Sequence, residues 1–265
     1  MPQHIKDYSS HGVTFGIAEA GAGRDILYLS SGMWFADDRA FVERLSGHGR
    51  VLAPVLPGFG RGDPGRGLTD VDDLAYLILD LVETLQLKDA LLVGASFGGW
   101  IAAEMAIKSC NSIAAIAFID PLGIKVGGRE VRDIADLFGL PDADLRARAY
   151  VDPSIFVSDV KAIDDVELER RMRARESLAR YGWSPFMHNP KLPGRLHRIS
   201  APSLFVWGAR DRIVAPSYGR HFAERTPGSR FVEIPGAAHF PHIEQPAATL
   251  DALLSFADAH RAARR

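Results

Sequence analysis

Apolar and polar residues are arranged along the chain so that short strands and longer helices are predicted in turn. Apolar runs of strand length alternate with stretches in which apolar residues recur every three or four positions. The runs predict strands near residues 12–19, 26–30, 50–55, 90–95, 113–119, 203–207 and 229–234. The longer stretches predict helices near residues 36–47, 70–87, 97–109, 216–226 and 245–261. This alternation indicates an α/β fold with a mainly parallel sheet and helices on both faces.

The helix expected at residues 70–87 has the clearest pattern. Thr69 is a suitable N-cap, and aspartates follow in the first turn, where the helix dipole favours negative charge. Its apolar residues form one buried stripe: Leu74, Leu77, Ile78, Leu81, Val82 and Leu85. This element belongs to the scaffold.

One serine lies where an apolar strand meets a helix of small residues. The strand ends in Gly94-Ala95-Ser96-Phe97-Gly98, a G-x-S-x-G turn, and residues 100–107 read as helix. Glycines without a Cβ permit the sharp turn that lifts the serine hydroxyl out of the backbone. Five-residue patterns of Gly and Ser also occur by chance, so the flanking strand and helix provide the support. Ser96 is therefore the candidate nucleophile.

A serine nucleophile needs a histidine base and a carboxylate that orients it. Asp211 follows the apolar run at 203–207, and His239 follows the run at 229–234. Asp211 has alternatives, since it is also suited to cap a turn or to pair with a neighbouring arginine. Asp120, directly after the run at 113–119, is a rival acid, although an Asp before Pro also initiates turns.

These segments together resemble the α/β-hydrolase superfamily, over nearly the whole chain. The order Ser, Asp, His matches, as do W-G-x-x-D-x-x-x-P at residues 207–216 and G-x-x-H-x-P-H-x-E-x-P at residues 236–246. The resemblance implies a doubly wound, mostly parallel sheet with a helical cap inserted after the sixth strand. Residues 1–121 and 199–265 would form the core, and residues 122–198, which interrupt the strand–helix rhythm, would form the cap.

The same resemblance implies that two backbone amides stabilise the oxyanion. One belongs to Phe97, after the nucleophile. The second should come from the loop at residues 30–35, where Met33 holds the donor position and Trp34 is an alternative. The family usually has His-Gly before this donor, whereas this chain has Ser31-Gly32. The replacement leaves the backbone donor in place but removes whatever support the imidazole ring gives the loop.

Aromatic and large apolar residues of the predicted cap are candidates for the substrate pocket, with packing inside the cap as the alternative. Those nearest the end of the cap are Trp183, Phe186 and Met187, and an earlier segment supplies Leu137 and Phe138. Residues beside the catalytic loops are further candidates to line an apolar acyl site: Trp34, Phe35, Phe97 and Trp100. Such a lining favours hydrophobic or aromatic substrates.

Neither a metal nor a cofactor is expected. His242 lies three residues after His239, but no further ligand falls at a suitable spacing, so His242 is read as structural and Glu244 as the start of the last helix. Residues 60–65 satisfy G-x-G-x-x-G, yet they do not lie between the first strand and a helix, as a dinucleotide site requires.

Composition narrows the class of partner. The chain has 265 residues, 47% of them hydrophobic, enough for one α/β domain with an insertion. Its net charge of −2 argues against nucleic acid, and the arginine-rich run near residue 170 alternates with glutamates at i,i+4, as on an exposed helix face. One cysteine, no apolar leader and no apolar run of membrane length predict a cytoplasmic protein without a membrane partner. The oligomeric state is not predicted.

The leading hypothesis is a serine hydrolase acting on a small carboxylic ester through an acyl-enzyme. Relatives that open halides or epoxides carry Asp where this chain has Ser96, which disfavours those reactions. The first alternative keeps the triad and cleaves a carbon–carbon bond in ring-fission products. The second is a non-catalytic ligand-binding protein on the same fold, because a fold does not by itself determine function.

Overall fold

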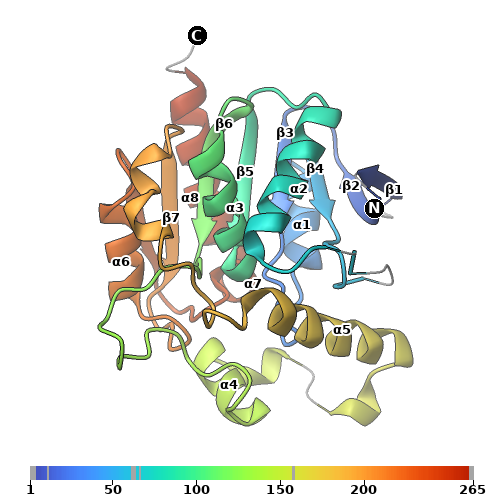
Figure 1. The fold of residues 1–265 in the computed structure, drawn as a ribbon, viewed down its shortest axis with the longest axis vertical. Helices are drawn as coiled ribbons and strands as arrows, with labels where there is room; N and C mark the ends of the chain where they lie inside the picture. The colour runs from blue at the N-terminus through green and yellow to red at the C-terminus, as the bar shows by residue number, and fades with distance from the viewer. Residues whose placement is uncertain (1–3, 11, 61–63, 66, 157–158, 263–265) are drawn as a thin grey trace.

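One mixed sheet of eight strands forms the centre of the computed structural model, which describes residues 4–10, 12–60, 64–65, 67–156 and 159–262. The strands follow the order β1-β2-β4-β3-β5-β6-β7-β8 across the sheet (Figure 1). β2 runs antiparallel to β1 and β4, and the other neighbours are parallel. The strands are β1 His4–Ser10, β2 Val13–Ala20, β3 Asp25–Leu29, β4 Arg50–Pro54, β5 Ala90–Ala95, β6 Ile113–Ile119, β7 Ser203–Gly208 and β8 Arg230–Ile234.

Helices cover both faces of this sheet. They are α1 Arg39–Ser46, α2 Val71–Thr84, α3 Ser96–Lys108, α4 Asp142–Ala149, α5 Asp165–Gly182, α6 Pro216–Glu224, α7 Pro241–Glu244 and α8 Pro246–Ala262. Short 3-10 turns lie at Pro153–Ile155, Val160–Ala162, Leu192–Gly194 and Leu196–Arg198. α2, α3 and α6 contribute to one apolar core cluster, whereas α1 and α8 contribute to the other.

The central strands are buried on both faces, and their side chains alternate between the two clusters. In β5, Leu92 points into the cluster that contains α2 and α3, and Leu91 and Val93 point into the cluster that contains α1 and α8. This arrangement explains why β5, β6 and β7 read as continuous apolar runs. The predicted doubly wound α/β architecture is confirmed.

The strand β1 is a difference from the sequence pattern, which predicts no strand before residue 12. Its sequence HIKDYSS has no apolar alternation, and Ile5 is largely exposed. An edge strand with little buried surface leaves no hydrophobic signal. β1 is held instead by antiparallel pairing with β2 along its whole length.

The start of α2 also differs from expectation. The N-cap is Asp70 rather than Thr69: the Asp70 carboxylate accepts the Asp73 N–H at 3.0 Å, and the Asp73 carboxylate accepts the Asp70 N–H at 3.3 Å. This reciprocal pair is a capping box. Thr69 lies one residue too early to serve the first turn, and it donates to Asp73 instead.

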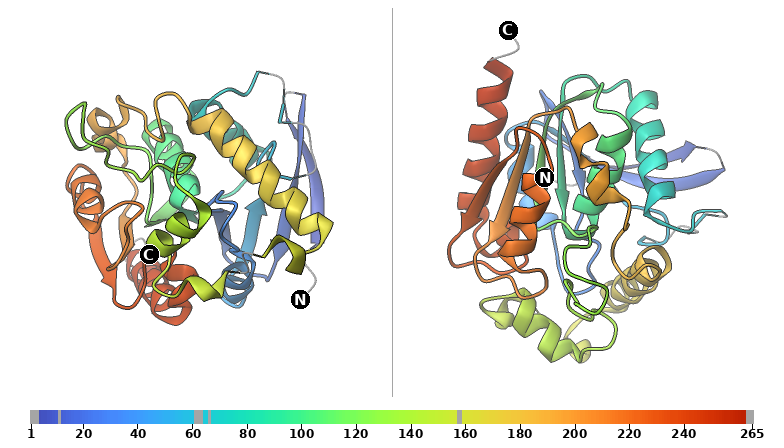
Figure 2. Two further views of the ribbon diagram at one scale, coloured as in Figure 1. Left: turned by 90° about the horizontal axis from the view of Figure 1, so that it is seen from below. Right: turned by 60° about the vertical axis from the view of Figure 1, so that its left-hand side comes forward.

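The chain between β6 and β7 forms a separate layer that contains α4 and α5. Figures 1 and 2 show both helices beyond the end of the sheet at which β5 passes into α3. The layer is attached to loops that leave this end. The Tyr150 hydroxyl donates to the Phe35 carbonyl at 2.8 Å, and the Tyr181 hydroxyl lies 3.0 Å from the Pro57 carbonyl. We call residues 122–198 the insertion.

Neither a membrane-spanning helix nor the full glycine-rich loop can be assigned within the described residues. Within the described part of the chain, no helix has both the length and the apolar character that a membrane crossing requires. The glycine-rich segment at residues 60–65 falls partly outside the described residues.

Candidate active site

Ser96 lies at the turn from β5 into α3, in a backbone conformation that few L-residues adopt. Its φ is +47°, in the left-handed region. The turn is crowded by backbone, since a Cβ on Gly94 would come within 2.7 Å of the Gly98 carbonyl. A Cβ on Gly98 would overlap the Leu29 carbonyl of the neighbouring strand. The two glycines of the motif are therefore required by close packing, and the turn projects Ser96 from the end of the sheet.

The structure brings Ser96, His239 and Asp211 together in one hydrogen-bonded chain. The Ser96 Oγ lies 2.8 Å from the His239 Nε2, and the His239 Nδ1 lies 2.7 Å from the Asp211 Oδ2. All three side chains are buried. Asp211 follows β7, and its other oxygen accepts the N–H groups of Ile213 and Val214 at 2.8 and 3.1 Å. These two amides fix the carboxylate in the plane that His239 needs.

This chain of contacts determines which way the protons point. A carboxylate accepts hydrogen bonds only, so the His239 Nδ1 carries the hydrogen that faces Asp211. The neutral ring then presents an unprotonated Nε2 to Ser96, and the Ser96 hydroxyl donates to it. A serine in this arrangement can lose its proton to His239 as it attacks an electrophile.

The rival acid Asp120 lies beside this chain without contacting Ser96. It is fully buried at the end of β6, and its Oδ1 accepts the Gly208 N–H at 3.0 Å. Burial, together with the nearby charge of Asp211, raises the pKa of Asp120 well above its usual value. A side-chain hydrogen bond between Asp120 and Asp211 acts in the same direction. The hydrogen bond to His239 belongs to Asp211.

Asp120, Asp211 and His239 also form the one group of described residues with the spacing of a metal site. Their ligand atoms lie within 4.8 Å of one another. A metal there would have to replace the hydrogen bond between His239 and Asp211, which already uses one ligand atom of each. The geometry is that of a serine–histidine–aspartate relay, and the expected absence of a metal stays a prediction.

The predicted oxyanion donors lie on two segments that touch. The Phe97 N–H donates to the Ser31 carbonyl at 3.3 Å, which joins the start of α3 to the loop at residues 30–35. Gly32, at φ +65°, packs against the Phe97 ring. Met33 is buried, and its carbonyl accepts the Ala36 N–H at 3.3 Å. An oxyanion at the Phe97 amide would take the place of the Ser31 carbonyl.

Sequence reasoning missed a buried polar cluster behind this loop. Asp38 accepts the Ser31 N–H at 2.7 Å and lies 3.1 Å from the Ser31 hydroxyl, and the His242 Nε2 lies 3.1 Å from its Oδ1. Asp38 and His242 are 204 positions apart in the chain, so no local pattern connects them. The one available signal was Ser31 at the position where related sequences have a histidine.

Glu244 was also misread, as the start of the last helix. α8 starts at Pro246, and Glu244 ends the short α7. Its carboxylate accepts the N–H groups of Ala238 and Val151, both at 2.7 Å. Burial raises the pKa of Glu244. Since Ala238 precedes His239 and Val151 belongs to the insertion, this carboxylate joins the insertion to the histidine loop.

The helix α4 makes a second connection of the same kind. The His239 N–H donates to the Ala149 carbonyl at 3.0 Å, and the Arg212 N–H donates to the Arg148 carbonyl at 3.3 Å. The carboxyl end of α4 therefore holds both the histidine loop and the loop of Asp211. Under this layer Ser96 is only 1% exposed and His239 is fully buried.

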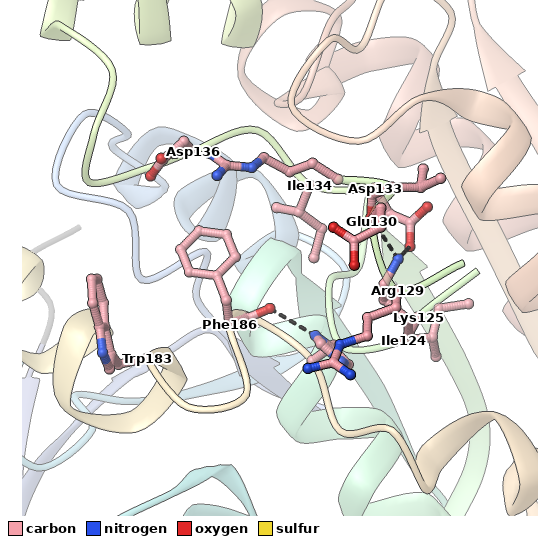
Figure 3. A pocket seen from close by; sticks show the side chains of 12 residues that line it. Ile124, Lys125, Arg129, Glu130, Asp133, Ile134, Asp136, Trp183 and Phe186 are labelled. Atoms are coloured by element: carbon pink, nitrogen blue, oxygen red, sulfur yellow. Dashed lines mark hydrogen bonds and ion pairs between the residues drawn. The ribbon is translucent and has the colours of Figure 1, made fainter. Parts of the chain in front are cut away.

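The predicted pocket residues divide into two groups. Trp183 and Phe186 line a cavity of about 470 Å³ in the insertion, with Arg129, Glu130 and Asp133 across it from Trp183 (Figure 3). Ser96 and His239 do not line this cavity. Phe138 is half-buried, and the other predicted residues are buried: Trp34, Phe35, Phe97, Trp100, Leu137 and Met187.

An aromatic series connects these groups. Trp34 stacks on Phe138 with ring centroids 6.0 Å apart, and Phe138 contacts both Trp183 at 5.8 Å and Phe186 at 6.2 Å. Met187 lies apart from the series, against Gly182, in a left-handed conformation with φ +54°. The series runs from the loop of Met33 to the cavity in the insertion.

The sequence of the chain identifies its family. Residues 11–252 match the alpha/beta hydrolase family. The chain belongs to this family. The homologues and structural neighbours are enzymes, and so is this protein.

The names of individual relatives indicate different activities. The chain is 26% identical, over 90% of its length and 96% of the relative, to a pimeloyl-[acyl-carrier protein] methyl ester esterase of Pectobacterium atrosepticum. It shares its fold with a meta-cleavage product hydrolase from Pseudomonas fluorescens, with a TM-score of 0.76, 20% identity and 96% and 97% of the two chains covered. A bromoperoxidase from Bacillus anthracis has a TM-score of 0.71, 18% identity and coverage of 96% and 99%. These structural likenesses show the fold alone.

Proposed function

We propose that this alpha/beta hydrolase is a serine esterase that cleaves a carboxylic ester through an acyl-enzyme. The observation that carries the proposal is the buried chain from the Ser96 Oγ through His239 to Asp211. The esterase relative, matched over nearly its whole length, supports an ester as the substrate class.

In the first half of the reaction, the Ser96 Oγ attacks the carbonyl carbon and its proton passes to the His239 Nε2. The Asp211 carboxylate stabilises the imidazolium that forms. The carbonyl oxygen becomes an oxyanion and accepts hydrogen bonds from the amides of Met33 and Phe97. His239 then donates its proton to the leaving alkoxide, the carbon–oxygen bond breaks, and an acyl-serine remains.

In the second half, water attacks the acyl-serine. His239 takes a proton from the water, and the oxyanion forms again at the two amides. The bond to the Ser96 Oγ breaks, His239 returns the proton to Ser96, and the carboxylic acid leaves. Each proton taken up by His239 is given back, so the cycle needs no cofactor.

The insertion fits the role of a cap over this site. Its α4 and α5 lie across the end of the sheet from which Ser96 projects, and the Ala149 carbonyl and Glu244 connect it to the histidine loop. We infer that residues 122–198 form this cap on a core of residues 1–121 and 199–265. The cavity lined by Trp183 and Phe186 is the proposed outer part of the substrate pocket, and the cytoplasmic location stays a prediction.

The decisive experiment is pre-steady-state hydrolysis of p-nitrophenyl acetate, butyrate and octanoate. An acyl-enzyme predicts a burst of p-nitrophenol equal to the enzyme concentration, followed by slower turnover, and both should vanish in Ser96→Ala. Ser255→Ala, at an exposed position on α8, is the matched control and should behave as the native protein. Thermal unfolding of each variant checks that the fold is intact.

The outcome separates the proposed function from its alternatives. Ser96-dependent turnover of an ester supports the esterase. Turnover of a ring-fission dienoate that exceeds turnover of every ester would replace it with carbon–carbon bond hydrolysis. Activity that persists in Ser96→Ala would show that Ser96 is not the nucleophile. If neither substrate class reacts, a non-catalytic binding role becomes the better explanation.

A further inference from the structure

Asp38 is a buried carboxylate to which three donors converge. It lies directly before α1 and is 8% exposed. The Ser31 N–H and hydroxyl and the His242 Nε2 all lie within 3.1 Å of its oxygens. A buried charge is expensive unless it is hydrogen-bonded, and this one receives several bonds.

Ser31 transmits this anchoring to the loop that carries the proposed donor Met33 and lies against the second donor, Phe97. Its N–H and hydroxyl are held by Asp38, and its carbonyl accepts the N–H of Phe97 at 3.3 Å. Met33 follows two residues later, beyond Gly32. Fixing the Ser31 peptide therefore fixes the path of the loop that presents Met33 and its distance from Phe97.

His242 connects this anchor to the loop of His239. It is 1% exposed, and the rings of Phe41 and Phe240 contact it edge-on, with centroids 5.4 and 6.0 Å away. Its Nε2 faces the Asp38 carboxylate, so Nε2 carries the hydrogen. Within the described part of the chain, its Nδ1 has no hydrogen-bond partner.

The charge of Asp38 is consistent with an anchor. Burial alone would raise the pKa of Asp38, but the hydrogen bond and charge of His242 and the Ser31 amide outweigh burial and lower it. Tyr28, buried on β3, also faces Asp38, and burial beside this carboxylate raises the pKa of its phenol. The charge of Asp38 also contributes to the raised pKa of Tyr150. Asp38 is therefore the ionised member of the cluster.

We propose that Asp38 and His242 are positioning residues for the oxyanion hole, which they hold in shape through Ser31. This inference rests on the proposed function. In related sequences, an imidazole at position 31 would support the loop at residues 30–35. We infer that Asp38 and His242 provide this support here. In this role both residues act through Ser31, so the expected signature is a loss of transition-state stabilisation with unchanged ground-state binding.

The first test is Asp38→Asn, which keeps the size of the side chain and removes its charge. Loss of a whole oxyanion donor typically costs about 10²–10³ in rate, so a displaced donor should cost about 10–100-fold in kcat. KM should change less than about threefold, because the affected interaction forms only in the transition state. Affinity for a trifluoromethyl ketone, whose adduct with Ser96 carries an oxyanion, should fall by the same factor as kcat/KM.

Two further variants distinguish positioning from general loss of packing. His242→Gln places an amide nitrogen near the position of Nε2 and should keep most of the activity, whereas His242→Leu should lose as much as Asp38→Asn. Ser31→Ala combined with Asp38→Asn should be no slower than Asp38→Asn alone, because both act through the same hydrogen bonds. Glu104→Gln is the control: this buried carboxylate accepts from Trp100 and Asn189, remote from Asp38, and its loss should affect stability alone.

The proposal is overturned if folded Asp38→Asn keeps kcat within twofold. It is also overturned if the variant raises KM while affinity for the trifluoromethyl ketone is unchanged, or if Glu104→Gln lowers kcat equally. Amide hydrogen exchange of residues 30–35 provides a readout without turnover: Asp38→Asn should accelerate it at least tenfold, and unchanged exchange would contradict the anchor. A native protein without ester turnover would refute the proposed function, while this exchange would still decide whether Asp38 holds the loop.

Discussion

At the scale of single residues, two buried carboxylates, Asp120 and Asp211, lie near His239, and one of them must carry the negative charge. Asp211 receives two backbone N–H groups as well as the His239 Nδ1. Asp120 receives one, from Gly208, and its pKa is raised by burial and by the charge of Asp211. Carboxylates this close do not both ionise readily in a buried site. The number of donors favours the charge on Asp211 and the proton on Asp120.

Substitution by asparagine should therefore affect the two positions very differently. Asp120→Asn replaces a neutral carboxyl group by a neutral amide of the same shape, and ester turnover should stay within about threefold. Asp211→Asn removes the charge that orients His239, and kcat should fall by about 10³–10⁴, as in other triads. The measurement is kcat for both variants, with thermal unfolding as the check on folding. A collapse in Asp120→Asn with a mild effect in Asp211→Asn would exchange their roles.

Sequence alone predicted the residues whose surroundings are local. Ser96, Asp211 and His239 each lie within five residues of the end of a strand, so that parallel topology places all three at one end of the sheet. Asp38 and His242 could not be found in this way, because their partnership exists only after α1 and α7 pack together. Asp120 was considered as a rival acid, but its raised pKa depends on a contact with Asp211 that no spacing reveals.

At the scale of elements, α5 is held by ion pairs that the sequence pattern anticipated. Glu167 binds Arg171 and Glu169 binds Arg173 at i,i+4, with distances of 2.8 and 2.9 Å. Glu167 also binds Arg170 at 2.8 Å, and Arg170 reaches toward the Ala36 carbonyl. The pairs of Glu167 are thus less exposed than the pattern suggested, and they lie between α5 and the loop after β3.

The ion pairs of Glu167 with Arg170 and Arg171 should make the thermal stability of the protein depend on pH below about 4.5. The hydrogen bond from Arg170 is the main cause that lowers the pKa of Glu167 from 4.5 to about 2, followed by the bond from Arg171. A pKa lowered by folding stabilises the protein above pH 4.5, and this contribution is lost as the pH falls toward 2. Glu167→Gln should lower Tm at pH 7, with a difference from the native protein that shrinks below pH 4.

Glu169→Gln serves as the control for this experiment, because the pair of Glu169 with Arg173 is more exposed and should contribute less. A constant difference in Tm between pH 7 and pH 2.5 in Glu167→Gln would show that lost packing, rather than the ion pairs, causes the effect.

The bounds of elements with a buried face were predicted from sequence to within a few residues. The edge strand β1 and the helices of the insertion were not predicted in this way. The hydrophobic pattern found the seven strands β2 to β8, and it is most continuous in β5, β6 and β7 because both of their faces are covered. It missed β1, which is stabilised by main-chain pairing at an edge. In the insertion it indicated only mixed helical segments, since α4 and α5 bury few residues and depend on contacts with distant loops.

At the scale of the whole molecule, the structure is a closed form. Ser96 and His239 are buried. If the insertion is the proposed cap, a substrate reaches them when part of this layer moves. The attachments on the side of α5 combine hydrogen bonds to loops with apolar packing, since Ala174, Leu178 and Tyr181 belong to the core cluster of α2 and α3. The Tyr181 hydroxyl, at the end of α5, lies 3.0 Å from the Pro57 carbonyl and 3.1 Å from the Pro64 carbonyl. We expect the layer to open at this side.

Removing this attachment should speed access to Ser96. Tyr181→Phe deletes the hydroxyl but keeps the ring, which stacks on Phe59, and a buried hydrogen bond contributes about 1 kcal/mol. A change of this size makes an open state about fivefold more populated. A bulky fluorophosphonate should then label Ser96 about fivefold faster, whereas Tyr76→Phe, on the exposed side of α2, should label at the native rate. Equal rates in both variants would place the route to Ser96 elsewhere, toward α4, where the carbonyls of Arg148 and Ala149 hold the catalytic loops.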